Sequence, residues 1–184
     1  MIKKKLIFFD TEFTELTQSA KLLSIGMVAD TGEKFYAEFT DFDPARLNEW
    51  IKENVVANFY LQKSNYADAG NIKIKDDTGE IATAIKVWLG QFKEEGKNVP
   101  IQFWGDSPAW DWILFCELFG GSFKRPANIH YMCMDLATVF QIKGYDPDCM
   151  RANFLNENHI TIEGHQHNAL YDALVTQKCY DVLK

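Results

Sequence analysis

The sequence predicts an α/β fold in which a mixed central β-sheet is flanked by α-helices. Apolar segments of strand length alternate along the chain with segments whose apolar residues recur at helical spacing. The resulting order is strand, hairpin, helix, strand, helix and C-terminal helix. That order indicates an α/β sandwich with a mixed sheet.

The composition supports a single domain over residues 1–184. Hydrophobic residues make up 47% of the 184 residues and charged residues 24%. These are ordinary values for a globular domain, and they argue against intrinsic disorder. A chain of this length buries roughly 70% of its unfolded surface in one core. No internal repeat or linker divides the sequence.

The first elements are a buried strand and a hairpin. Leu6–Phe9 is a continuous apolar run that Asp10 closes, which is typical of a central strand. Leu22–Ala29 and Phe35–Phe39 are predicted to form two more strands. The segment Asp30–Glu33 between them has turn chemistry, so these strands are expected to pair as a hairpin.

Two helices, a strand and a loop are expected in the middle of the chain. A helix begins near Asp77–Glu80, where an acid can complement free backbone amides, and its apolar face then recurs at helical spacing. Val99–Trp104 is expected to be a short strand. Ser107-Pro108 is expected to open a second helix that ends at Gly120-Gly121. The polar stretch Leu61–Asp76 is expected to be a surface loop.

The last helix is expected to run from about His167 to Leu183. Its apolar positions are Leu170, Ala173, Leu174 and Val182. With this helix the α/β pattern is complete, and nothing in the sequence suggests a second domain.

Charge and cysteine content limit the classes of partner. The 19 basic and 26 acidic side chains give a formal net charge of −7, so nucleic acid must be handled at a local site rather than by bulk positive charge. Four scattered cysteines predict reduced thiols in the cytosol. The apolar run after Lys3–Lys5 is too short for a signal peptide, and no stretch approaches the roughly 20 apolar residues of a membrane span. We therefore expect a cytoplasmic protein without a membrane partner.

The first chemical signal is Asp10-Thr11-Glu12 at the end of the first strand. Residues two apart in a strand point to the same face, so Asp10 and Glu12 can hold their carboxylates side by side. Adjacent carboxylates repel each other, and a hard cation such as Mg²⁺ or Mn²⁺ removes that cost. Alone, such a triplet is more often a solvated acidic turn.

The second signal is Asp111, in or near the first turn of an otherwise apolar helix. An acid there can serve chemistry, or it can simply complement the helix dipole. Taken singly, the two interpretations are about equal. Asp106 competes with Asp111 for any such role.

The third signal is His167-Asn168-Ala169-Leu170-Tyr171-Asp172. An imidazole beside metal-held carboxylates is the usual group for taking a proton from water near neutral pH. Asp172 could return to the same metal as Asp10. A zinc site at His165 and His167 is discounted, because the other candidate ligands are hard carboxylates rather than thiolates.

Together, four acids and one histidine from three segments predict a two-metal site for phosphodiester hydrolysis. Two cations held by shared carboxylates can activate water on one side of a phosphodiester and stabilise the leaving oxygen on the other. The predicted cofactor is therefore Mg²⁺ or Mn²⁺, with two ions per site.

At these three motifs the sequence resembles the DEDDh family of 3′-5′ exonucleases, which have a ribonuclease H-like fold. The matching segments are Phe8–Thr14, Trp110–Leu114 and His167–Asp172. Within that family the chain most resembles the RNase T-like exoribonucleases, particularly the mycobacterial-type branch. The resemblance extends from Leu6 to about Lys184.

The resemblance implies a role for each residue. Asp10, Glu12 and Asp172 would hold the metal on the nucleophile side, and Asp10 would also reach the second. Asp111 would assist that second metal, and His167 would be the general base.

The resemblance also implies a 3′-5′ exoribonuclease that releases nucleoside 5′-monophosphates from single-stranded RNA or short 3′ overhangs, and a homodimer. Phe13 could stack on terminal bases, as aromatic side chains do for single strands, or pack in the core, and the two are held equal. Thr14 and Trp110 are further candidates for substrate contact. Lys143 and Arg151 flank a polar loop and are candidates for phosphate contacts. The alternatives are a 3′-5′ exodeoxyribonuclease acting on DNA ends and a non-catalytic nucleic-acid-binding module.

Overall fold

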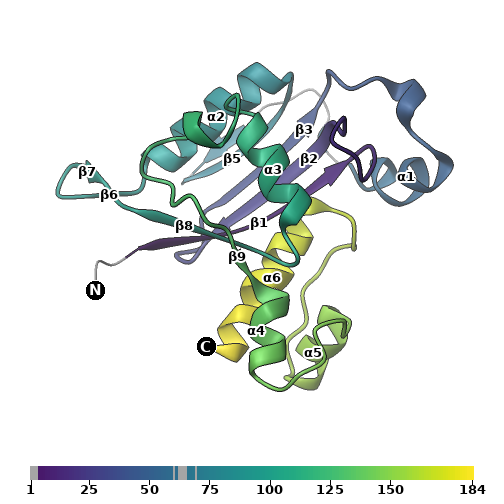
Figure 1. Cartoon of the computed structure of the whole chain (residues 1–184), viewed down its shortest axis with the longest axis vertical. Coiled ribbons are helices and arrows are strands. Elements are labelled where there is room, and N and C mark those ends of the chain that lie inside the picture. Colours follow the sequence, from purple (N-terminus) through teal and green to yellow (C-terminus); the bar gives the residue numbers. More distant parts are fainter. Residues whose placement is uncertain (1–3, 60, 62–65, 69) are drawn as a thin grey trace.

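The centre of the protein is a seven-stranded mixed sheet (Figure 1). The computed structural model describes residues 4–59, 61, 66–68 and 70–184. The strand order is β4-β5-β3-β2-β1-β8-β9, and β6 and β7 form a separate ribbon. The strands are β1 (Lys5–Phe13), β2 (Leu22–Ala29), β3 (Lys34–Phe39), β4 (Tyr66–Asp68), β5 (Asn71–Asp76), β6 (Lys93–Glu94), β7 (Lys97–Asn98), β8 (Ile101–Gly105) and β9 (Met134–Asp135).

Helices cover both faces of the sheet (Figure 1). They are α1 (Glu49–Asn54), α2 (Thr78–Gly90), α3 (Ala109–Glu117), α4 (Leu136–Ile142), α5 (Arg151–Glu157) and α6 (Ala169–Leu183). The apolar side chains of α2 and α3 share one core with one face of β1, β2 and β3. Helix α6 packs on the opposite face, where Leu170 and Ala173 contact Val28 and Tyr36. In the described parts of the chain, none of the helices is long and apolar enough to cross a membrane.

The predicted fold class is confirmed, and so are several predicted elements. Strand β1 pairs antiparallel with β2 and parallel with β8, so the sheet is mixed. Strands β2 and β3 form the expected hairpin. Asp77 caps α2, because its carboxylate accepts hydrogen bonds from the backbone N–H groups of Gly79 and Glu80.

The prediction of a surface loop over Leu61–Asp76 was wrong for its second half. Asn71–Asp76 forms β5, which pairs parallel with β3 and antiparallel with β4. Alternation of polar and apolar residues places Ile72 and Ile74 against the core below α2. Lys73 and Lys75, which alternate with them, look loop-like in the sequence but occupy the other face. Residues 62–65 and 69 of that prediction lie outside the described residues.

Two predicted helix starts shift, by one residue for α3 and by two for α6. Helix α3 begins at Ala109, and Ser107 does not cap it. Ser107 has a φ of 53° and donates its N–H to Asp135. Helix α6 begins at Ala169, because the side chain of Asn168 accepts the N–H of Tyr171 and so forms the cap.

Helices α4 and α5 were not predicted, and they build a second core with the C-terminal half of α6. Its buried residues are Leu136, Phe140, Phe154, Leu155, Val175, Cys179 and Leu183. Each helix has only seven residues, a length at which tertiary packing rather than local propensity decides helix formation. The start of α5 forms one wall of the site described next.

Candidate active site

A cavity of about 360 Å³ opens where the end of β1 meets the first turns of α3 and α6. Its lining is strongly acidic. The ionisable groups in it are Asp10, Glu12, Asp106, Asp111, Asp172, His167, Arg151 and Tyr171. All five residues predicted to be catalytic are therefore brought together in one cavity.

Strand geometry places Asp10 and Glu12 of β1 on one face of the sheet and Thr11, between them, on the other. Phe9 belongs to the core under α2 and α3, whereas Phe8 contacts Tyr180 of α6. By alternation, Asp10 and Glu12 share the α6 side and Thr11 the α3 side. One carboxylate oxygen each from Asp10, Glu12 and Asp172 lies within 4.8 Å of the others. This spacing fits oxygen ligands around one hard cation.

Thr11 uses the opposite face of β1 to orient Asp111. The Oδ1 atom of Asp111 accepts the Thr11 N–H at 3.0 Å and the Thr11 hydroxyl at 2.6 Å. Asp106, which competed with Asp111 in the sequence, is instead paired with Arg151. The two acids therefore have different partners, and Asp111 is the one that the resemblance had already favoured.

His167 sits at the entrance to α6 in a left-handed backbone conformation, with a φ of 65°. Its N–H donates to Oδ2 of Asp172 at 2.8 Å, which holds this turn against the start of α6. Its Nδ1 lies 3.8 Å from Oε1 of Glu12. The ring also meets the edge of Trp50, with centroids 5.0 Å apart. Sequence reasoning missed Trp50, which lies in a short helix without a motif.

The start of α6 is anchored to the sheet by a buried polar network and by a close backbone contact. The side-chain amide of Asn168 donates to the Asn58 carbonyl at 3.2 Å and to the Tyr36 hydroxyl at 3.4 Å. Gly26 of β2 lies opposite Asp10, and a Cβ atom there would stand 2.3 Å from the backbone of Ala169. These contacts fix the position of the start of α6, and with it the positions of His167 and Asp172.

Burial dominates the electrostatics of the cluster. Burial, followed by the charges of Asp111, Asp172 and Glu12, raises the pKa of Asp10 well above its ordinary value. Burial also raises the pKa of Glu12 to about 8 and that of Asp172 to about 7. The pKa of His167 is lowered by burial, which favours the neutral imidazole. Carboxyl groups that resist ionisation together are a donor set that fits a divalent cation.

Without metal, the protein is expected to lose stability as the pH rises. The folded pKa values of Glu12 and Asp172, about 8 and about 7, exceed those of an unfolded chain. The folded state therefore binds more protons than the unfolded state, and the free energy of unfolding falls between about pH 4 and pH 8. Each group contributes at most about 1.4 kcal/mol per pH unit. Melting temperatures in chelator from pH 5 to 8.5 measure this decline.

Excess Mg²⁺ or Mn²⁺ should raise the melting temperature most at the alkaline end, since bound cation stabilises the folded state. A melting temperature that responds neither to pH nor to cation would contradict this prediction.

Comparison with known proteins assigns the family. Residues 5–183 match the sequence model of the Rv2179c-like 3′-5′ exoribonuclease domain. The chain belongs to this family. It is therefore an enzyme of the 3′-5′ exonuclease class, and the resemblance predicted from the three motifs is confirmed.

Relatives of the Rv2179c-like domain support the same assignment. The chain is 26% identical over 137 residues to the 3′-5′ exoribonuclease Rv2179c of Mycobacterium tuberculosis, which covers 74% of each chain. The fold is similar to the nuclease domain of 3′hExo, a DEDDh family member solved with rAMP, at a TM-score of 0.63 and 10% identity, covering 96% and 90% of the two chains. It is also similar to Pop2p of S. pombe, solved with Mg²⁺ and Mn²⁺, at a TM-score of 0.61 and 14% identity, covering 95% and 81%. These likenesses confirm the ribonuclease H-like fold.

The three residues predicted to contact substrate differ in position. Phe13 lines the cavity, whereas Thr14 and Trp110 are not among its lining residues. Thr14 is buried, and its hydroxyl accepts the N–H of Lys21. Phe13 is also partly buried and packs against the core, so its position agrees with both roles considered for it.

Proposed function

We propose that the protein hydrolyses the terminal phosphodiester at the 3′ end of single-stranded RNA or of short 3′ overhangs, releasing nucleoside 5′-monophosphates. The observation that carries this proposal is the convergence of Asp10, Glu12, Asp111, Asp172 and His167 in one cavity of an exoribonuclease-family chain. The family assignment favours RNA over DNA. The solved relative that contains rAMP points the same way.

The acidic residues would hold two divalent cations, Mg²⁺ or Mn²⁺. Asp10, Glu12 and Asp172 have the spacing of one shared site, and Asp111, oriented by Thr11, would serve the second. When bound, such cations stabilise negative charge on phosphoryl oxygens and make water more acidic. The clustered carboxylates would thus turn an acidic cavity into one that accepts a phosphate.

His167 would be the general base. Burial lowers its pKa, so the imidazole is neutral and able to accept a proton near neutral pH. The proton of the attacking water would go to Nε2, while Nδ1 stays beside the Glu12 carboxylate, 3.8 Å away. That carboxylate would stabilise the imidazolium as it forms. Phe13, on the cavity wall, would contact the terminal base.

The test is a time course on 5′-labelled RNA and DNA of one sequence, each with Mg²⁺, Mn²⁺ or chelator. We expect a ladder that shortens by single nucleotides from the 3′ end, only with metal, and faster on RNA, since the 2′-OH is the available discriminator. His167→Ala should lower kcat by about 10²–10⁴-fold, the usual contribution of a general base.

The exposed neighbour His165 provides the matched control, and His165→Ala should retain full activity. Full activity of His167→Ala would exclude this residue as the base. Faster cleavage of DNA would reassign the substrate, and metal-independent cleavage would overturn the mechanism.

A further inference from the structure

Asp106 is an acid in the cavity that the proposed metal set leaves out. It directly follows β8 and lines the same cavity as the four proposed ligands. Its negative charge contributes to raising the pKa values of Asp10, Asp111 and Asp172, although burial is the largest cause for each. Because Asp106 lines this cavity, its charge can act on a cation held by the proposed ligands.

Arg151 binds both oxygens of this carboxylate. Its Nε donates to Oδ2 of Asp106 at 2.7 Å and its Nη2 to Oδ1 at 2.9 Å. The same guanidinium donates to the carbonyls of Pro147 at 2.7 Å and Cys149 at 2.8 Å. The guanidinium also lies over the ring of Phe140, with its central carbon (Cζ) 4.0 Å from the ring centroid. With its donors engaged in this way, Arg151 is not placed to bind a substrate phosphate, the role considered from the sequence.

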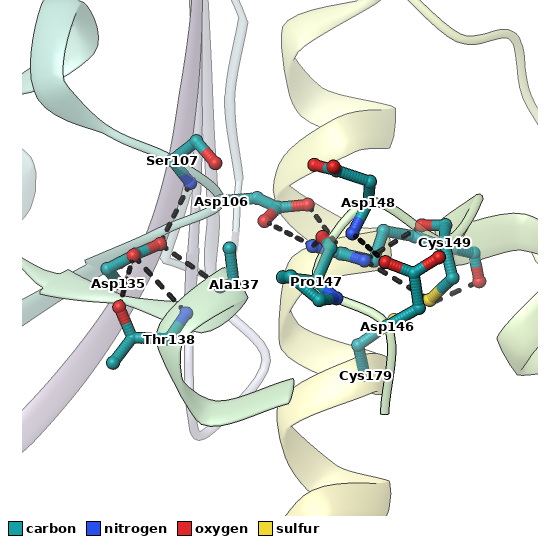
Figure 2. A network of polar contacts seen from close by, with 11 residues as sticks. Asp106, Ser107, Asp135, Ala137, Thr138, Asp146, Pro147, Asp148, Cys149 and Cys179 are labelled. Atoms are coloured by element: carbon teal, nitrogen blue, oxygen red, sulfur yellow. Dashed lines mark hydrogen bonds and ion pairs between the residues drawn. The ribbon is translucent and has the colours of Figure 1, made fainter. Parts of the chain in front are cut away.

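The ion pair joins the helical wall of the cavity to the end of β8. Arg151 is the first residue of α5, and its neighbours Met150 and Ala152 line the cavity. Figure 2 shows the contacts of Asp106 beside a second tie, in which Asp135 accepts the N–H of Ser107 at 3.0 Å while capping α4. Breaking the ion pair would therefore free the Asp106 carboxylate and remove a contact that holds the start of α5 in place.

We propose that Arg151 is a positioning residue of the metal centre: its paired guanidinium keeps Asp106 out of the ligand set and fixes the α5 wall of the cavity. This inference rests on the proposed function, because it concerns cations held by the acidic cluster. The charges of the two residues predict the direction in which each substitution changes the affinity for cations. Without Arg151 the centre gains an unpaired carboxylate, whereas without Asp106 it gains an unpaired cation.

The test is Mn²⁺ binding without substrate, by titration calorimetry and by electron paramagnetic resonance of free Mn²⁺. The proteins are wild type, Arg151→Met, Asp106→Asn and the double variant. We expect Arg151→Met to bind Mn²⁺ about tenfold more tightly or with an additional ion, and Asp106→Asn to bind about tenfold more weakly. The double variant should return to within about threefold of wild type. Such opposite shifts follow from the signs of the two charges, whereas general loosening would weaken binding in both variants.

Activity and a matched control complete the test. Arg151→Met should lower kcat about tenfold or more despite tighter Mn²⁺ binding, because Asp106 then competes for the cation. Lys97→Met removes an exposed cation of β7, away from the cavity, and should change neither binding nor rate. If Arg151→Met does not fold, Asp106→Asn and the double variant still decide, since only the latter restores binding.

Two outcomes overturn the inference in different ways. Equal Mn²⁺ affinities in all the variants, or shifts of one sign only, would overturn the role of Arg151 while leaving the proposed function intact. A wild-type protein that binds no Mn²⁺ would overturn the proposed function and this inference with it.

Discussion

Replacing Asp10 by Asn is expected to abolish nuclease activity and to raise the melting temperature of the metal-free protein. Asp10 lies at the centre of the carboxyl cluster, where burial and the charges of Asp111, Asp172 and Glu12 oppose its ionisation. Asn keeps the shape but removes the charge, so the metal-free cluster is relieved of repulsion. The same change removes the ligand proposed to be shared by both cations.

We expect kcat to fall by about 10³-fold, the upper end of the drop seen when a group that stabilises transition-state charge is removed. At pH 8.5 in chelator, we expect Asn to stabilise the fold by about 1–2 kcal/mol, which for a domain of this size raises the melting temperature by roughly 2–8 °C. The rise in melting temperature on adding Mn²⁺ should disappear.

Asp148→Asn is the matched control, because Asp148 is exposed and does not line the cavity. It should leave activity and the response to Mn²⁺ unchanged. An Asp10→Asn protein that is less stable than wild type without metal, yet active, would show that this cluster is not a metal centre.

The candidate site could be proposed from the sequence because local patterns mark its acidic residues. The alternation of a β-strand places Asp10 and Glu12 on one face, and the helix expected from about His167 places Asp172 on the turn after that histidine. What brings these segments together is the parallel pairing of β1 with β8 and the packing of α6 across β1 and β2. Three short motifs in the right order were sufficient to indicate that arrangement.

The remaining features depend on contacts that leave no local signature. Asp106 and Arg151 are 45 positions apart, and nothing near either residue indicates that they pair. The short helices α4 and α5 acquire their stability from the C-terminal half of α6. The ring contact between Trp50 and His167 likewise joins two distant segments. In each case tertiary packing decides the outcome, so single-segment reasoning could not find it.

Gly26 is a residue whose importance appears only in the folded protein. It faces α6 rather than the core under α2 and α3, because its neighbours Ile25 and Met27 belong to that core. The absence of a side chain lets the backbone at Ala169 and Leu170 lie against the middle of β2. This close approach places the start of α6 directly beside Asp10, which pairs with Gly26 across the two strands.

Gly26→Ala is therefore expected to be severely destabilising although it adds a single methyl group. The new Cβ would stand 2.3 Å from backbone atoms of Ala169 and Leu170, and neither strand nor helix can move away cheaply. We expect a loss of about 3 kcal/mol or more, at the upper end for overpacking, measured by urea unfolding. Since relief of the clash displaces α6, Asp172 and His167 should move away from Asp10, and Mn²⁺ affinity should fall even where the protein remains folded.

Gly90→Ala is the control, because nothing lies within 4 Å of a Cβ there, and it should be neutral or stabilising by up to about 1 kcal/mol. A Gly26→Ala protein with wild-type stability and Mn²⁺ affinity would mean that the position of α6 does not depend on this contact.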